Sequence, residues 1–288
     1  MEPLFDMSIV VERRRRAAAR PVPGADFLAL RAAEDLGERL ATVERRFERA
    51  ASLFCGSGLA ARALRASGKV GDVTRVEAHP DLLRGDAGQI AAPELVPFAP
   101  ESLDLVVSLL HFQDVNDLPG LLVQIRRALK PDGLFLGAFA GAGTLGELRD
   151  SLLDAETAIS GGASPRVSPF VDIRDAGALL QRAGFALPVA DLEPVTVRYD
   201  DLFALARDLR AMGATNALAA RSRNPARREL FARAAAAYAT RFADADGRIR
   251  ATFNLVWLSG WAPHESQRKP LKPGSAAVSL TKLLGEEG

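Results

Sequence analysis

The segment from Ala50 to Ser67, AASLFCGSGLAARALRAS, determines the fold class that the sequence predicts. Its first five residues, Ala50–Phe54, are mostly apolar and predict a buried strand. The run Leu59–Ser67 is rich in Ala, Leu and Arg, which are strong helix formers, and Gly68 stands where a helix C-terminal cap is expected. Between them lies Cys55-Gly56-Ser57-Gly58. The order strand, glycine turn, helix is typical of the first unit of a parallel sheet.

The chain beyond this segment continues to alternate apolar runs with amphipathic ones. Strands are predicted at Val73–Ala78, at the nearly continuous apolar run Leu103–Leu109 and at Leu134–Phe139. An amphipathic helix is predicted over Asp117–Leu129, which the turn Lys130–Gly133 ends. Strands that alternate with helices of about 10–15 residues predict an α/β protein with right-handed crossovers.

Further helices and strands flank this core. Helices are predicted over Phe27–Arg49, Thr144–Ile159, Asp172–Ala183, Asp201–Arg210 and Arg227–Phe242, a loop over Gly161–Phe170, and strands over Phe185–Tyr199 and Ala251–Trp261. We expect an N-terminal helical segment at residues 1–48, a cofactor-binding core at 49–199, a helical insertion at 200–243, and a last strand with a tail at 244–288. The tail beyond Lys269 contains prolines and is expected to be partly loose.

Composition limits the class of protein. Of 288 residues, 48% are hydrophobic and 25% charged, as in ordinary globular domains, which excludes wholesale disorder. Lys and Arg number 37 against 36 Asp and Glu, a balance that argues against a dedicated nucleic-acid binder. The single cysteine, Cys55, excludes an intramolecular disulfide and fits a reducing compartment. We therefore expect a bacterial cytoplasmic protein.

Contact with membranes or partners is a separate question. No apolar run approaches the roughly 18–20 residues that span a bilayer, so no transmembrane segment is expected. Arg13–Arg16 allow two interpretations, a basic helix face that meets a partner or an anionic surface, and an ordinary solvated helix face. The first would permit peripheral association with the inner face of the membrane.

The glycine turn and a later acid form a candidate cofactor site. In parallel sheets ligands bind at the carboxyl ends of the strands, and Gly56 and Gly58 allow a cofactor to approach the backbone. Glu77 ends the second strand 77 − 58 = 19 residues later, where an acid commonly binds ribose hydroxyls. A tight connection and a solvated acid are the alternatives. Cys55 stands near a helix N-terminus, where the pKa of a thiol can fall, although we assign it no nucleophilic role.

Several stretches carry a family resemblance. Leu103–Ser108, Val115–Pro119 and Leu129–Gly133 resemble class I S-adenosylmethionine-dependent methyltransferases. More narrowly, the chain resembles the family of mitochondrial respiratory complex I assembly factor 5 and its alphaproteobacterial relatives. The stretches that carry this closer resemblance are Gly161–Phe170, Asp208–Gly213, Asn216, Phe242–Gly247 and Gly260–Gln267.

The resemblance implies a fold and a site. The fold would be the Rossmann-like class I methyltransferase fold, a mostly parallel seven-stranded sheet with helices on both faces and a helical insertion before the last strand. S-adenosylmethionine would be held by Cys55, Gly56, Ser57, Gly58, Glu77 and Ser108. The substrate would be a protein, a complex I subunit, with arginine hydroxylation as the family's variant reaction. Its candidate contacts are Arg166, Ser168, Asn216, His264 and Glu265.

Four departures from the family pattern fall at the expected cofactor site. Ser52 replaces an acid, Phe54 the first glycine, Ala92 another acid, and Gln113-Asp114 a His-Trp pair. A lost hydrogen bond to a charged acceptor costs about 1.5–3 kcal/mol, so two losses weaken binding on the order of a hundredfold to ten-thousandfold. S-adenosylmethionine binding is therefore expected to be weak. The benzyl group of Phe54 must swing aside or occupy ligand space.

Two functions stay open. The chain is either an enzyme that acts on a protein, or a non-catalytic assembly factor that binds a complex I subunit without turnover. No catalytic residue is assigned. No metal site is expected either, because His79, His111 and His264 are far apart and lack a metal-binding spacing.

Overall fold

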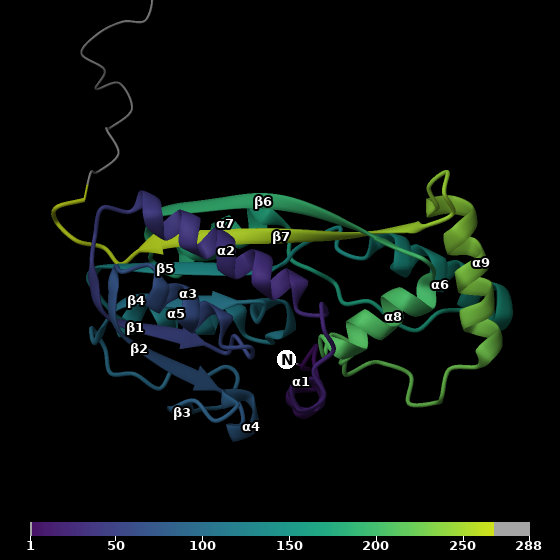
Figure 1. Ribbon diagram of the computed structural model, residues 1–288, viewed down its shortest axis with the longest axis horizontal. Coiled ribbons are helices and arrows are strands. Elements are labelled where there is room, and N and C mark those ends of the chain that lie inside the picture. The colour runs from purple at the N-terminus through teal and green to yellow at the C-terminus, as the bar shows by residue number, and fades with distance from the viewer. Residues whose placement is uncertain (1, 268–288) are drawn as a thin grey trace, which may run out of the picture.

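The computed structural model describes residues 2–267, which form a seven-stranded sheet with helices on both faces (Figure 1). The order of the strands is β3-β2-β1-β4-β5-β7-β6. Their bounds are β1 Phe47–Leu53, β2 Val70–Glu77, β3 Gly88–Ile90, β4 Leu103–Leu109, β5 Leu129–Ala140, β6 Ala186–Tyr199 and β7 Ile249–Trp261. Strands β1 to β5 run parallel, while β7 is antiparallel to both β5 and β6. This confirms the predicted fold class.

Helices cover both faces of the sheet because their apolar stripes face it. The helices are α1 Met7–Ala19, α2 Phe27–Thr42, α3 Leu59–Ala66, α4 Pro80–Leu83, α5 Leu118–Ala128, α6 Gly146–Ser160, α7 Ile173–Arg182, α8 Leu202–Ala211 and α9 Arg228–Phe242. On one face Leu36 of α2 and Leu64 of α3 are buried in one apolar cluster. On the other, Ile125 of α5 and Leu180 of α7 are buried in a second. Asp117 caps α5, its carboxylate accepting a hydrogen bond from the N–H of Gly120 at 2.8 Å.

The largest difference from the sequence prediction lies between the second helix and the first strand. The helix predicted to reach Arg49 ends at Thr42, and β1 begins at Phe47. Phe47 is buried and donates its N–H to the carbonyl of Lys69 at 2.8 Å, at the start of the pairing with β2. Pairing with a distant strand therefore overrides the local helical periodicity. The tail beyond Lys269 lies outside the described residues.

Strands β6 and β7 extend past the parallel strands and carry a helical lobe. Figure 1 shows α6, α8 and α9 gathered at the end farthest from β1, β2 and β3. Helices α8 and α9 lie between β6 and β7 in sequence, as predicted for the insertion. A third apolar cluster, which includes Leu152, Leu205, Tyr238 and Phe253, joins these helices to the two strands. Within residues 2–267, no helix has the length and apolarity needed to cross a bilayer.

Candidate functional site

A cavity of about 420 Å³ opens at the carboxyl ends of the parallel strands. The glycine turn after β1 lines it with Cys55, Gly56 and Ser57, and α1 lines it from the opposite side with Arg14. Its wall also includes residues after α8 and the β7 residue Phe253. Ligands bind at this edge in open α/β sheets, so the cavity is the candidate site.

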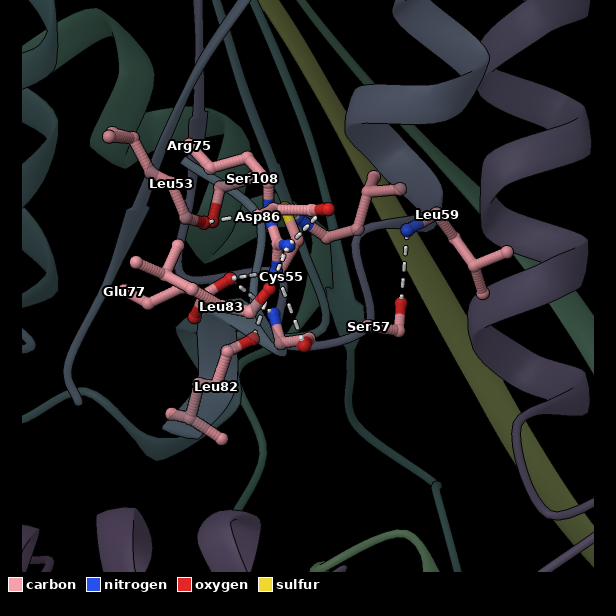
Figure 2. A network of polar contacts seen from close by, with 12 residues as sticks. Leu53, Cys55, Ser57, Leu59, Arg75, Glu77, Leu82, Leu83, Asp86 and Ser108 are labelled. Atoms are coloured by element: carbon pink, nitrogen blue, oxygen red, sulfur yellow. Dashed lines mark hydrogen bonds and ion pairs between the residues drawn. The ribbon is translucent and has the colours of Figure 1, made fainter. Parts of the chain in front are cut away.

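The glycine turn has the backbone geometry that the sequence predicts. Gly56 and Gly58 take φ values of +65° and +72°, in the left-handed region that favours glycine. The N–H of Ser57 donates to the carbonyl of Cys55 at 2.7 Å, and its hydroxyl accepts from the N–H of Leu59 at 3.3 Å (Figure 2). The turn thus delivers the chain into α3 beside the cavity.

The benzyl group of Phe54 swings aside, one of the two outcomes the sequence allowed. Phe54 lines part of the cavity, yet only 2% of it is exposed. Its ring belongs to the apolar cluster of Val76 and Phe112, and its centroid lies 4.6 Å from that of His111. The φ of +54° costs about 1–2 kcal/mol for a non-glycine residue, and burial of the ring offsets this with about 1.5–3 kcal/mol.

Glu77 is buried outside the cavity wall and pairs with a neighbour on its own strand. Only 1% of Glu77 is exposed, and its Oε1 accepts hydrogen bonds from the N–H of Gly56 at 2.8 Å and from Arg75 Nη2 at 3.3 Å. Figure 2 shows Arg75 and Glu77 close to Cys55 of the glycine turn. Burial raises the pKa of Glu77 to about 7, against the lowering effect of the Arg75 charge.

Arg75 is the functional residue that sequence reasoning missed. It is 1% exposed and lines the cavity, whereas Glu77 does not. Its guanidinium donates to the carbonyls of Leu82 at 3.0 Å and Leu83 at 2.9 Å, and to Asp86 at 2.7 Å. The available signal was a single cation inside the predicted strand Val73–Ala78, two residues before the acid and therefore on the same face of the strand.

The side chains of Cys55 and Ser108 hydrogen-bond to backbone groups near the carboxyl ends of β1 and β4. The Ser108 hydroxyl is buried and donates to the carbonyl of Leu53 at 3.0 Å. The sulfur of Cys55 accepts from the N–H of Leu109 at 3.2 Å. Burial raises the pKa of the Cys55 thiol to about 11, so the fall that a helix N-terminus can produce does not occur.

Helix α1 covers the cavity through Arg14. Its guanidinium donates to the carbonyl of Leu110 at 3.0 Å, to Asp114 at 2.9 Å and to Nδ1 of His111 at 3.1 Å. Because Nε2 of His111 lies 2.8 Å from the carbonyl of Pro93, that nitrogen carries the proton. Burial lowers the pKa of His111 to about 3, so the ring is neutral. Arg14 thus does not fit the interpretation of Arg13–Arg16 as an ordinary solvated helix face.

The remaining candidate residues divide between the cavity and other places. Ser168 and Gln113 line the cavity. Arg166 instead pairs with Glu156 of α6 at 2.7 Å, and the Nδ2 of Asn216 donates to the carbonyl of Pro165 at 2.8 Å. These contacts fix the loop of residues 161–170 rather than face a ligand. Ala92 is exposed at the surface.

His264 and Glu265 lie away from the cavity, contrary to the expectation that they contact substrate. Both are exposed and follow β7. Because β7 is antiparallel to β5, Trp261 at its end pairs with Leu134 near the beginning of β5. The pair therefore stands at the opposite edge of the sheet. Residues 2–267 contain no cluster of three or more His, Cys, Asp or Glu side chains placed to hold a metal.

Comparison with known proteins identifies the family. A family model described as a methyltransferase domain matches residues 53–137. Human mitochondrial arginine-hydroxylase NDUFAF5 is 36% identical, over 97% of this chain and 83% of the human protein. The chain belongs to the NDUFAF5 arginine-hydroxylase family. The family member of Dictyostelium discoideum is 46% identical over 64% of this chain and 42% of its own length.

Methyltransferases resemble the chain as well. A malonyl-[acyl-carrier protein] O-methyltransferase of Laribacter hongkongensis is 35% identical over 78% of this chain and 79% of its own. The crystal structure of YcgJ from Bacillus subtilis superimposes with a TM-score of 0.55 at 17% identity, covering 80% of this chain and 99% of that one. This member of the arginine-hydroxylase family therefore resembles methyltransferases in sequence and in fold.

The family's methyltransferase domain implies S-adenosylmethionine, and the residues present fit it poorly. A ribose needs a free carboxylate acceptor, but Glu77 is 1% exposed and its Oε1 already accepts from Arg75 Nη2 and the Gly56 N–H. A Cβ on Gly58 would lie 3.2 Å from Arg75 Nη1, so the guanidinium fills the space beneath the turn.

Proposed function

We propose that this protein is a protein-binding member of the arginine-hydroxylase family that supports assembly of respiratory complex I without turnover of S-adenosylmethionine. The observation that carries the proposal is that Glu77 is buried and its Oε1 is occupied by Arg75 and the Gly56 N–H. Of the four departures from the family pattern, Phe54 and Gln113-Asp114 line the cavity, whereas Ser52 is buried in β1 and Ala92 is exposed at the surface. The partner in this proposal, a complex I subunit, is the one that the resemblance in the sequence implies.

Hydroxylation of an arginine in that subunit is the second candidate. It is favoured by the 36% identity to human arginine-hydroxylase NDUFAF5 over 97% of this chain. The two candidates share a protein partner and differ in whether the partner leaves modified.

Calorimetric titration with S-adenosylmethionine tests the first candidate. We expect the wild-type chain to bind S-adenosylmethionine with a Kd above about 1 mM, which corresponds to a binding free energy smaller in magnitude than about 4 kcal/mol. The variant Arg75→Ala with Phe54→Gly should bind more tightly, because it unseals Glu77 and restores the first glycine. Arg46→Ala, an exposed arginine away from the cavity, is the control. A micromolar Kd for the wild type would refute the proposal.

Complementation in the parent organism separates the two candidates. Deletion of the gene should lower the amount of assembled complex I, and both the wild type and Glu77→Gln should restore it. Mass spectrometry of complex I subunits then reads arginine hydroxylation directly. Loss of a hydroxyarginine on deletion and its return with the wild-type gene would establish the second candidate. Normal complex I in the deletion strain would overturn both.

A further inference from the structure

The cavity has two chemically different ends. Near the glycine turn its wall contains the side chains of Arg62 and Arg84, while elsewhere it contains Phe170 together with Met212 and Phe253 of the helical lobe's apolar cluster. Arginine offers several N–H donors to an anion, and aromatic and thioether side chains favour an apolar group. A ligand that matches both ends carries a charge at one end and an apolar body at the other.

Among the described residues, two arginines at the charged end of the cavity form no ion pair. Asp86 pairs with Arg75 at 2.7 Å and Asp114 pairs with Arg14 at 2.9 Å. Arg62 and Arg84 form no ion pair with any residue between 2 and 267, and Asp26 is the remaining acid in the cavity wall. The cavity wall therefore favours an anion over a cation.

A second observation at the same end is independent of that balance. Arg75 is a fully buried cation in the cavity wall, and it adds positive charge at this end although its Nη atoms are already bonded to Asp86, Glu77 and two backbone carbonyls. Helix α3 also begins at Leu59, directly after the turn, so its positive N-terminal end lies beside these arginines. The Nη1 of Arg62 lies 3.6 Å from the position of a Cβ on Gly58, folded over the same turn.

We propose that this cavity binds an amphipathic anion, an acyl chain with a carboxylate or phosphate head. The head lies at the glycine turn against the exposed Arg62 and Arg84, with the buried Arg75 behind them, and the chain extends toward Phe170 and Met212. A volume of about 420 Å³ falls within the usual range of small-molecule sites, about 300–1,000 Å³. This ligand class goes beyond the proposed function and does not depend on the protein partner.

Calorimetry with simple probes, on the full chain and below their micelle concentrations, tests the proposal. Decanoate and decyl phosphate carry the same chain with different heads, and the tighter of the two identifies the source of the anion. We expect at least one to bind with a Kd below about 1 mM. The neutral probe 1-decanol lacks the charged head and should bind at least about tenfold more weakly than the tighter anionic probe. Inorganic phosphate lacks the apolar chain and should show no measurable binding.

Variants of the chain test each end of the cavity. Arg62→Gln with Arg84→Gln should weaken binding of the anionic probe about tenfold or more, because both charges are removed while the side-chain stems largely remain. Both arginines are exposed, so the double variant is expected to keep the melting temperature of the wild type. Phe170→Gln should weaken binding of the decyl probes. The control variant Arg46→Ala should leave the Kd of every probe unchanged.

Three results would overturn the inference. They are equal affinity for 1-decanol and decanoate, an unchanged Kd in the double glutamine variant, and no binding of either anionic probe to the folded chain. Titration with S-adenosylmethionine tests the proposed function and not this ligand class. A micromolar Kd for that cofactor would refute the proposed function while the decyl probes still decide this ligand class.

Discussion

At the scale of single residues, Arg75 and Glu77 are the pair on which the site depends. Both are buried, and removal of one partner from a buried ion pair costs about 3–5 kcal/mol because the other charge is left uncompensated. We therefore expect Arg75→Met to lower the free energy of unfolding by about that amount at a pH near 8, measured by urea denaturation. Adding Glu77→Gln should recover part of the loss. A double variant no more stable than Arg75→Met would show that the pair is not coupled.

The same glutamate makes stability depend on pH. Burial raises the pKa of Glu77 to about 7, whereas the ordinary value is 4.5. Between these values the unfolded chain releases the proton and the folded chain retains it, so folded stability falls as pH rises from 4.5 to about 7. Glu77→Gln cannot titrate and should lack this fall, which urea midpoints at several pH values will measure. A constant difference between wild type and variant over this window would contradict the prediction.

At the scale of elements, α1 is held over the cavity chiefly by Arg14. Its guanidinium reaches the segment after β4 at Leu110 and Asp114, far away in sequence. Hydrogen bonds to charged groups contribute about 1.5–3 kcal/mol each, so Arg14→Ala should accelerate exchange of the α1 amides at least about tenfold. Arg16→Ala is the matched control, because Arg16 is exposed and pairs within the helix with Glu12. Equal acceleration in both variants would show that Arg14 does not anchor α1.

At the scale of the whole molecule, the long strands β6 and β7 join the helical lobe to the parallel sheet. Since both strands contribute to the lobe's apolar cluster and to the main sheet, we expect a single cooperative unfolding transition. Leu205→Ala, at a fully buried position of α8, should destabilise the chain by about 2–5 kcal/mol.

Two spectroscopic probes follow this transition. Fluorescence of Trp257 and Trp261 reports the sheet, and far-UV circular dichroism reports all helices. Their urea midpoints should coincide in the wild type and shift together in Leu205→Ala. Separate midpoints would mean that the lobe unfolds independently.

Local sequence patterns determined the order of elements in this protein. The apolar run Leu103–Leu109 became β4 with the same bounds, and the run after the glycine turn became α3 over Leu59–Ala66. Gly56 and Gly58 take the positive φ values expected at a cofactor-type turn. These features depend on residues close in sequence, where periodicity and backbone preference suffice.

Tertiary structure decided what the site can bind. The start of β1 at Phe47 depends on pairing with β2, and the placement of His264 at the far edge depends on the antiparallel direction of β7. The pairing of Glu77 with Arg75 depends on the position of the long Arg75 side chain, which donates hydrogen bonds to the carbonyls of Leu82 and Leu83. Strand partners and the reach of a flexible side chain are fixed only when distant segments pack together, so no local pattern contains them.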